Sequence, residues 1–242
     1  MNLKGRVAVV TGAAGALGLA ATRVLLEDGA RVALVDIDAL RLDGVTRFLR
    51  GERMPVACDV SDTAALRAGI ERVRSEFGPP EVVVHAAGAS ADAGGLRDES
   101  AWRSVIASRL DAAMALARLT LPDMASRGWG RLVFVGGPGS RGNRGAADAA
   151  ADGGLASLAA SLAREFAGRG VTVNTIAPAF VRSPAGTESL TEAQRRQALA
   201  AIPAARLGEP EEFGHAVRYL VSPLAGFVTG EVLRLDGGLH LG

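Results

Sequence analysis

The residues best suited to chemistry stand near the start of the chain, in VAVVTGAAGALG (residues 7–18). A glycine-rich turn between a β-branched run and a helix offers backbone N–H groups to a pyrophosphate. Gly12 is expected to permit the tight turn, and Gly18 to permit close packing of helix on strand. Asp36 ends the next apolar run, where a carboxylate accepts hydrogen bonds from ribose hydroxyls and repels a 2′-phosphate. The combination predicts a dinucleotide site that favours NAD over NADP.

Two other groups could carry chemistry of their own. Asp148 and Asp152 are four residues apart, so they share one helix face, and paired carboxylates can do acid/base work if one pKa is raised. Ser140 is a hydroxyl inside the glycine-rich loop 136–145, but with no base within sequence reach we expect it to be an exposed loop serine. For Asp36 the alternative interpretation is a solvated carboxylate, because Asp38 is an equally acidic neighbour.

An alternation of strands and helices must position these groups. Apolar runs typical of buried parallel strands recur seven times, at residues 7–10, 32–35, 56–58, 82–84, 132–135, 171–176 and 232–235. Helix-length segments lie between them, at residues 16–28, 39–49, 62–77, 100–126, 146–167 and 211–221, with an extra helix at 192–201 behind a capping box. Glycines fall where C-terminal caps are expected: Gly29, Gly78, Gly128 and Gly170. The pattern predicts an α/β fold, a doubly wound parallel sheet flanked by helices, with residues 1–242 forming one dinucleotide-binding domain.

Composition excludes several classes of function. The chain has 242 residues, of which 48% are hydrophobic, and a net charge of +1, which gives no reason to expect nucleic acid. No apolar run is long enough to span a bilayer and no cleavable signal pattern is present, so we expect no membrane association. Cys58 is the only cysteine, which excludes an internal disulfide and fits a cytoplasmic protein. With no Cys/His cluster, no metal site is expected.

Seven segments together resemble the short-chain dehydrogenase/reductase family, and most closely its bacterial 3-oxoacyl-carrier-protein reductase-like members. They are TGAAGALG (11–18), CDV (58–60), HAAG (85–88), GRLVFV (130–135), VTVNTIAPAFVRSP (171–184), RLGEPEEFGHAVRYLVSP (206–223) and FVTGEVLRLDGG (227–238). The resemblance runs end to end. It implies a Rossmann-like fold and cofactor-binding positions at Gly12, Gly15, Leu17, Gly18, Asp36, Asp59, Val60, Ala87, Gly88, Pro178, Val181 and Ser183.

Two cofactor positions depart from the family pattern. Ala16 stands where the family has its middle glycine, and its methyl group is expected to weaken NAD binding. His85 and Ala86 replace two asparagines, so we expect a hydrogen-bonded brace between strands to be lost. A histidine at a buried strand end is expected to be structural rather than a metal ligand.

The resemblance also implies a catalytic tetrad that this chain lacks. In the family a tyrosine transfers the proton, a lysine four residues later lowers the tyrosine pKa and holds the ribose, a serine polarises the substrate oxygen, and an asparagine anchors a water relay. In this chain Asp148 stands at the tyrosine position, Asp152 at the lysine position, Gly137 at the serine position and Arg109 at the asparagine position. The only lysine is Lys4 and the only tyrosine is Tyr219, so no alignment supplies both groups. We hypothesise that Arg109 forms an ion pair with Asp148 or Asp152, which replaces a catalytic cluster by a structural one.

Three functions remain open from the sequence. The first is a pseudoenzyme that joins a homo- or hetero-oligomer through two helices rich in small residues (100–126 and 146–167), with an active short-chain dehydrogenase/reductase as the expected partner. The second is a working enzyme with remodelled chemistry, an atypical NAD-dependent oxidoreductase or a non-redox lyase that uses Asp148 and Asp152. The third is a nicotinamide-sensing regulatory protein.

Overall fold

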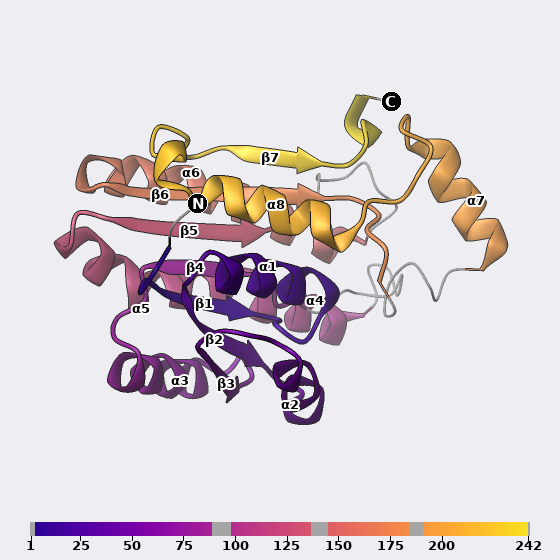
Figure 1. Cartoon of the computed structure of the whole chain (residues 1–242). Coiled ribbons are helices and arrows are strands. Elements are labelled where there is room, and N and C mark those ends of the chain that lie inside the picture. Colours follow the sequence, from indigo (N-terminus) through magenta and orange to yellow (C-terminus); the bar gives the residue numbers. More distant parts are fainter. Residues whose placement is uncertain (1–2, 89–97, 137–144, 184–190, 242) are drawn as a thin grey trace.

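A seven-stranded parallel sheet forms the centre of the molecule. The computed structural model describes residues 3–88, 98–136, 145–183 and 191–241, and its strands follow the order β3-β2-β1-β4-β5-β6-β7 (Figure 1). The strands are β1 (Val7–Thr11), β2 (Arg31–Asp36), β3 (Arg53–Ala57), β4 (Val82–His85), β5 (Gly130–Val135), β6 (Val171–Pro178) and β7 (Val232–Leu235). All seven predicted strands are confirmed, and the order reverses between β1 and β4, as in a doubly wound Rossmann-like fold.

Helices fill the connections between the strands. They are α1 (Ala16–Glu27), α2 (Ala39–Arg47), α3 (Thr63–Glu76), α4 (Glu99–Val105), η2 (Ile106–Asp111), α5 (Ala112–Ser126), α6 (Ala146–Phe166), α7 (Glu192–Ala201) and α8 (Pro210–Leu220), with short 3-10 turns η3 (Ala167–Arg169), η5 (Pro223–Ala225) and η6 (Leu239–Leu241). The predicted extra helix is confirmed with its capping box, in which Thr191 and Gln194 cap one another. In the described part of the chain no helix is long and apolar enough to cross a membrane.

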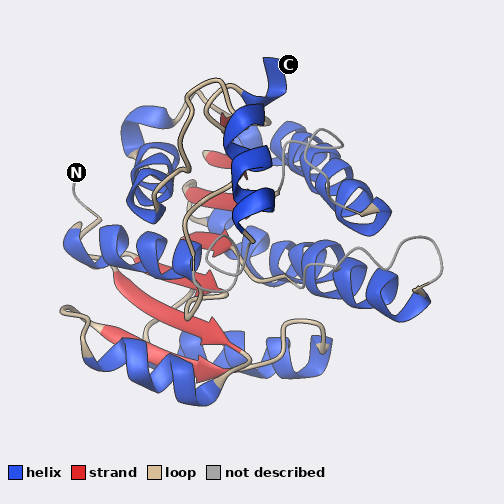
Figure 2. Cartoon of the chain, turned by 90° about the vertical axis from the view of Figure 1, so that its right-hand side faces the viewer, coloured by secondary structure: helices blue, strands red, loops and turns tan. Residues whose placement is uncertain are grey.

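Two hydrophobic clusters place the helices on opposite faces of the sheet. One cluster joins the sheet to α3, α5 and α6, and the other joins it to α1, α2 and α8. Figure 2 looks onto the edge at which the strands end, with a helical layer on each side of the sheet. Burial on both faces explains why most strands read as continuous apolar runs.

Local chemistry sets the helix boundaries. Aspartate side chains cap three helix N-termini: Asp38 at α2, Asp62 at α3 and Asp98 at α4. The four predicted cap glycines, Gly29, Gly78, Gly128 and Gly170, all have positive φ angles, which confirms that these positions need a residue without a Cβ.

The predicted continuous helix over 100–126 is interrupted by a π-helical segment. Six residues of η2 separate α4 from α5, and Arg109 lies within them. The carbonyl of Arg109 accepts a hydrogen bond from the buried His85 ring, so this backbone group has a partner outside the helix. Single-turn π segments inside α-helices occur frequently at functional sites.

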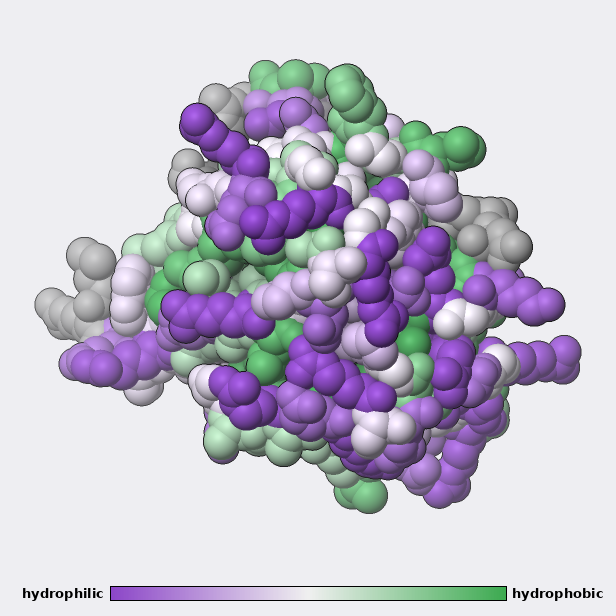
Figure 3. Space-filling model, turned by 90° about the vertical axis from the view of Figure 1, so that its left-hand side faces the viewer, coloured by the Kyte–Doolittle hydropathy of each residue, from purple (hydrophilic) through white to green (hydrophobic). Residues whose placement is uncertain are grey.

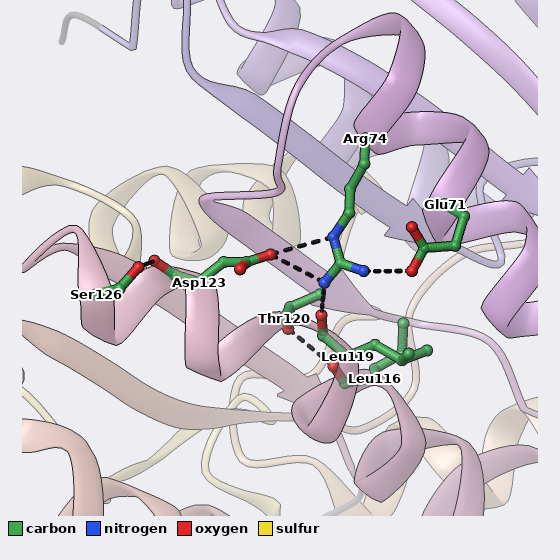
Figure 4. Close-up of polar contacts among 7 residues, drawn as sticks. All are labelled: Glu71, Arg74, Leu116, Leu119, Thr120, Asp123 and Ser126. Atoms are coloured by element: carbon green, nitrogen blue, oxygen red, sulfur yellow. Dashed lines mark hydrogen bonds and ion pairs between the residues drawn. The ribbon is translucent and has the colours of Figure 1, made fainter.

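Arg74 fastens α3 to the second half of α5 (Figure 4). Its guanidinium binds Glu71 at 2.5 Å, binds Asp123 at 2.9 Å, and donates to the main-chain carbonyl of Leu119. Pro122 lies inside α5 and lacks the N–H that would continue the helical ladder. The guanidinium therefore supports α5 close to the point where its own hydrogen bonding is weakest.

Candidate functional site

The glycine turn between β1 and α1 is shaped by close backbone contacts. Gly12 has a φ of +65°, and a Cβ there would lie 2.7 Å from the carbonyl oxygen of Ala86. A Cβ on Gly18 would lie 2.1 Å from the carbonyl oxygen of Gly12. Both predicted packing roles are confirmed: Gly12 permits the tight turn, and Gly18 lets the helix approach the strand.

Asp36 holds this turn from the end of β2. Its Oδ2 accepts a hydrogen bond from the Ala14 N–H at 2.9 Å, and its Oδ1 accepts from the Asp38 N–H at 3.1 Å. Each carboxylate oxygen has a second lone pair, so ribose hydroxyls could still be bound. Asp36 is therefore not the freely solvated carboxylate of the alternative interpretation, although its role toward a ribose stays a prediction.

The other predicted cofactor positions lie along the same edge of the sheet. Because the strands are parallel, residues that follow their carboxyl ends gather there. Gly15 and Leu17 begin α1, Asp59 and Val60 follow β3, Ala87 and Gly88 follow β4, and Pro178, Val181 and Ser183 end or follow β6. Gly137 and Ser140 lie outside the described residues.

The expected loss of a brace at His85 is wrong. The His85 Nδ1 lies 2.8 Å from the Thr11 hydroxyl, and its Nε2 lies 3.0 Å from the carbonyl oxygen of Arg109. The Thr11 hydroxyl also accepts the Ala87 N–H at 3.2 Å. One imidazole therefore ties β4 to β1 and to η2, because its two nitrogens are far enough apart to reach both. The structural role expected for this histidine is confirmed.

The protonation of His85 follows from these partners. A carbonyl oxygen can only accept, so Nε2 carries the hydrogen and Nδ1 accepts from the Thr11 hydroxyl. Burial, which removes the hydration of the charged form, and the neighbouring Arg109 charge together lower the pKa of His85 to about 4. His85 is thus a neutral structural histidine at pH 7.

Arg109 forms ion pairs with both aspartates of α6. Its Nη1 lies 2.8 Å from the Asp148 Oδ1, and its Nη2 contacts the Asp152 Oδ1. All three residues are buried, with exposed fractions of 7%, 1% and 3% for Arg109, Asp148 and Asp152. The predicted ion pair is confirmed, and it extends to both carboxylates. Asp148 lies in the first turn of α6, where the helix dipole also favours negative charge.

This buried triad is closely packed yet not fully satisfied. A Cβ on Gly88 would lie 2.4 Å from the Arg109 Cγ, so the glycine gives the arginine stem its path inward. Among the described residues, Asp148 Oδ2 and Asp152 Oδ2 have no hydrogen-bond partner. The two oxygens can only accept hydrogen bonds, so any group that binds them must bring donors.

The only lysine and the only tyrosine lie at the opposite edge of the sheet. Asp28, which closes α1 just before β2 begins, accepts the Leu3 N–H at 2.8 Å and the Arg218 Nε–H at 3.0 Å. Lys4 and Tyr219 directly follow these two donor residues, so both lie where the strands begin. Figure 3 views this side of the molecule, where hydrophilic and hydrophobic residues are intermixed. Tyr219 is 51% exposed.

A cavity of about 320 Å³ lies near the ends of β6 and β7. Ala179 and Phe180 line it together with Arg206, Glu212 and Arg234. Arg206 is already paired with Glu212 at 2.6 Å, and this pairing lowers the pKa of Glu212 to about 2. Ala179, which lines the cavity, directly follows Pro178, but no residue of the glycine turn lines it.

The two ends of the edge fit a dinucleotide unequally. At the β1–α1 turn, the glycine contacts, the first-turn N–H groups of α1 and the Asp36 carboxylate suit an adenosine ribose and a pyrophosphate. At the α6 end, the groups facing the sheet are two carboxylates and a guanidinium already bound to them. Among the described residues, no group of three or more His, Cys, Asp or Glu could hold a metal ion.

Sequence reasoning missed two functional contacts. The first is Thr11, which links His85 to Ala87. Thr11 is a polar residue at the end of an apolar strand, and it pairs with His85 in the sheet. Its polar side chain at that position could have indicated the contact. Arg41 donates to the Ala14 carbonyl at 3.3 Å, although its place in the helix after Asp36 pointed toward the same turn.

Comparisons with known proteins agree with the family resemblance of the sequence. Residues 12–240 match the family model described as Enoyl-(Acyl carrier protein) reductase. The chain is 36% identical to 3-oxoacyl-[acyl-carrier-protein] reductase FabG of Vibrio cholerae and 34% identical to the protein of the same name in Escherichia coli, in both cases over the full length of both chains. It is also 36% identical to Nodulation protein G of Azospirillum brasilense, over 97% of this chain and 98% of the relative.

Proposed function

Because the chain belongs to the short-chain dehydrogenase/reductase family of oxidoreductases, we propose that it is a pseudoenzyme of that family. In this proposal it binds NAD and associates as a non-catalytic subunit with an active family member. The single observation that carries the proposal is the Arg109 guanidinium bound to both Asp148 and Asp152 in a buried site. Where family members are expected to hold a phenol and an ammonium group, this chain has a buried cluster of two carboxylates and one guanidinium that bind one another.

Electrostatics explains why the triad is unsuited to the family reaction. An unperturbed tyrosine titrates near ~10 and needs a neighbouring cation to exchange a proton at neutral pH. Here the cation is the Arg109 guanidinium, which already binds two carboxylates. No phenol can join it, because the only tyrosine, Tyr219, lies at the opposite edge. The triad therefore supports a structural role for Arg109, Asp148 and Asp152.

The adenosine end supports NAD as the cofactor. Asp36 places a carboxylate at the β1–α1 turn, which suits a free ribose and disfavours a 2′-phosphate. When bound, the nicotinamide would supply hydride chemistry; this chain would contribute the first-turn N–H groups of α1 and the Asp36 carboxylate as ligands. Ala16 keeps its predicted effect of weakening NAD binding. We also propose a cytoplasmic location, in keeping with a single free cysteine, Cys58.

A stripe of small residues on α6 supports association with another subunit. The exposed face of this helix presents Ala146, Ala150, Gly153, Ser157 and Ala160 at helical spacing. Side chains this small let a second helix approach closely, and we propose an active family member as the partner. The partner itself would supply the tyrosine and lysine for turnover.

Co-purification with an active family member tests this proposal. The chain and a family member with an intact Tyr–Lys pair are co-expressed, one tagged, and the complex is sized by chromatography. We expect a mixed oligomer that Ser157→Trp disrupts, since the indole blocks the stripe, while Arg23→Trp, at an exposed position of α1, leaves it intact. Elution of the chain apart from every active homologue tried would contradict the proposal.

One observation favours a second function, a non-redox lyase. The unpartnered Oδ2 atoms of Asp148 and Asp152 are acceptors that a substrate hydroxyl could use. In that case Asp148→Asn would abolish a reaction of the isolated chain while its circular dichroism spectrum stayed unchanged. A complete absence of turnover with hydroxyacyl thioesters would exclude this alternative.

A further inference from the structure

The cavity beside the ends of β6 and β7 has no part in the proposed function. Its volume is about 320 Å³, and its lining comes mainly from the turn that follows β7 and the segment that joins α7 to α8. Ligand pockets in proteins run from about 300 to 1,000 Å³. A cavity of this size therefore suits one compact organic molecule.

Close packing fixes the walls of this cavity. A Cβ on Gly237, which has a φ of +60°, would lie 2.7 Å from the Ile202 Cγ2, and a Cβ on Gly238 would lie 3.2 Å from the Pro203 Cγ. The Ala204 N–H donates to the Gly237 carbonyl at 3.0 Å. The turn after β7 is thus held against the segment after α7, and the cavity between them is a built feature of the fold.

The backbone beside the cavity has a conformation that alanine disfavours. Ala205 has a φ of +53°, and it is the only non-glycine residue with a positive φ in the part of the chain that the structure describes. Its N–H donates to the Ile202 carbonyl at 2.8 Å, and its neighbours Ala204 and Arg206 both line the cavity. Strained backbone gathers at sites that hold ligands, so this residue supports a binding role for the cavity.

The charged side chains of the lining leave one positive charge available. Arg206 is bound to Glu212 by two contacts of 2.8 and 2.6 Å. The Asp236 carboxylate already binds two backbone N–H groups and a histidine ring. Arg234 is exposed and has no hydrogen-bond or ion-pair partner among the residues that the structure describes. The group left for a ligand is therefore a guanidinium.

We propose that this cavity binds a small carboxylate with a compact apolar body, a ligand that lies outside the proposed function. The Arg234 guanidinium pairs with the carboxylate, because charge-assisted hydrogen bonds of this kind are strong and often bidentate. Phe180, Ile202 and Leu235 line the cavity and cover the apolar body. Neither the glycine turn nor the Arg109 cluster contributes a residue to this lining, so the site is separate from both.

Calorimetric titration of the full chain with benzoate, benzyl alcohol and benzylamine tests the proposal. The three probes share one ring and differ in charge. We expect saturable binding of benzoate, and binding at least tenfold weaker for the neutral and the cationic probe. Arg234→Gln should weaken benzoate binding about tenfold, since it removes a hydrogen bond between charged groups. Arg67→Gln removes the same charge at an exposed position of α3 and should leave benzoate affinity unchanged.

A second variant tests the place of the site without changing its charge. Ala179→Leu puts a larger side chain into the lining and should abolish benzoate binding while the circular dichroism spectrum stays that of the native chain. Benzoate affinity that was equal in Arg234→Gln and the native chain would overturn the proposal. Benzyl alcohol bound as tightly as benzoate, or no saturable binding of benzoate at all, would overturn it too.

Discussion

The β1–α1 turn and the N-terminal part of α6 both carry aspartate and arginine side chains, but these side chains have different partners in the two regions. At the β1–α1 turn, Asp36 and Arg41 contact the backbone and leave donors and lone pairs for a ligand. At the α6 end, Asp148, Asp152 and Arg109 contact one another and are buried. Charged side chains at one edge of a sheet therefore do not by themselves indicate catalysis. What matters is whether the charges are paired inside the protein or left available to a ligand.

Of the substitutions considered, removal of Arg109 should have the largest effect on the stability of the protein. Arg109→Met would leave two buried carboxylates without a cation, and we expect it to lower the free energy of unfolding by about 3–5 kcal/mol in urea titrations. Combining it with Asp148→Asn and Asp152→Asn should restore most of that loss, since no buried charge remains. If the single variant were as stable as the native chain, the structural role of the triad would be wrong.

Acid should weaken the brace at His85. The pKa of His85 falls from its ordinary 6.5 to about 4 in the folded state, so the unfolded chain binds more protons between these values. Stability is fully present above pH 6.5 and is lost as the pH falls toward 4, by on the order of 2–3 kcal/mol at pH 4.5. The measurement is urea unfolding of the native chain and His85→Asn at pH 7 and 4.5. An advantage of the native chain that stayed constant with pH would argue against a neutral buried histidine.

A methyl group at Gly12 should disrupt the β1–α1 turn and its nucleotide binding. Gly12→Ala imposes a φ of +65° on alanine and places its Cβ 2.7 Å from the Ala86 carbonyl oxygen. We expect a loss of about 1–3 kcal/mol in stability, and loss of NADH binding in calorimetry. Gly44→Ala is the matched control, because Gly44 lies within α2 with no atom within 4 Å of its Cβ position, and it should be neutral or slightly stabilising. Unchanged NADH affinity in Gly12→Ala would place the nucleotide elsewhere.

The smallest effect on stability is expected at the N-terminal cap of α7, which lies outside both the β1–α1 turn and the Arg109 cluster. Thr191→Ala removes the reciprocal cap of α7 and should cost about 1 kcal/mol, while Thr191→Ser keeps the hydroxyl and should behave as the native chain. Neither variant should alter nucleotide affinity. A change in NADH affinity in Thr191→Ala would mean that α7 also takes part in the nucleotide site, in addition to the β1–α1 turn.

The sequence predicted the framework well because its signals are local. Apolar runs identified all seven strands, and glycine positions identified four helix caps. Contacts between distant segments were harder to foresee. The pairing of Arg109 with α6 was predicted only through a family resemblance, and the double ion pair depends on Gly88 admitting the arginine stem. The His85 brace was misjudged, since residue type alone did not reveal that an imidazole could span from Thr11 to the π-helical turn.

The most direct test of the central claim is a turnover assay of the isolated chain. NADH oxidation is followed with a 3-oxoacyl thioester at high protein concentration, in the absence of any other family member. A structural triad predicts no turnover above that of buffer, and the same result for Asp148→Asn. Steady NADH oxidation by the native chain that Asp148→Asn abolished would show that the α6 carboxylates carry chemistry and would contradict the account.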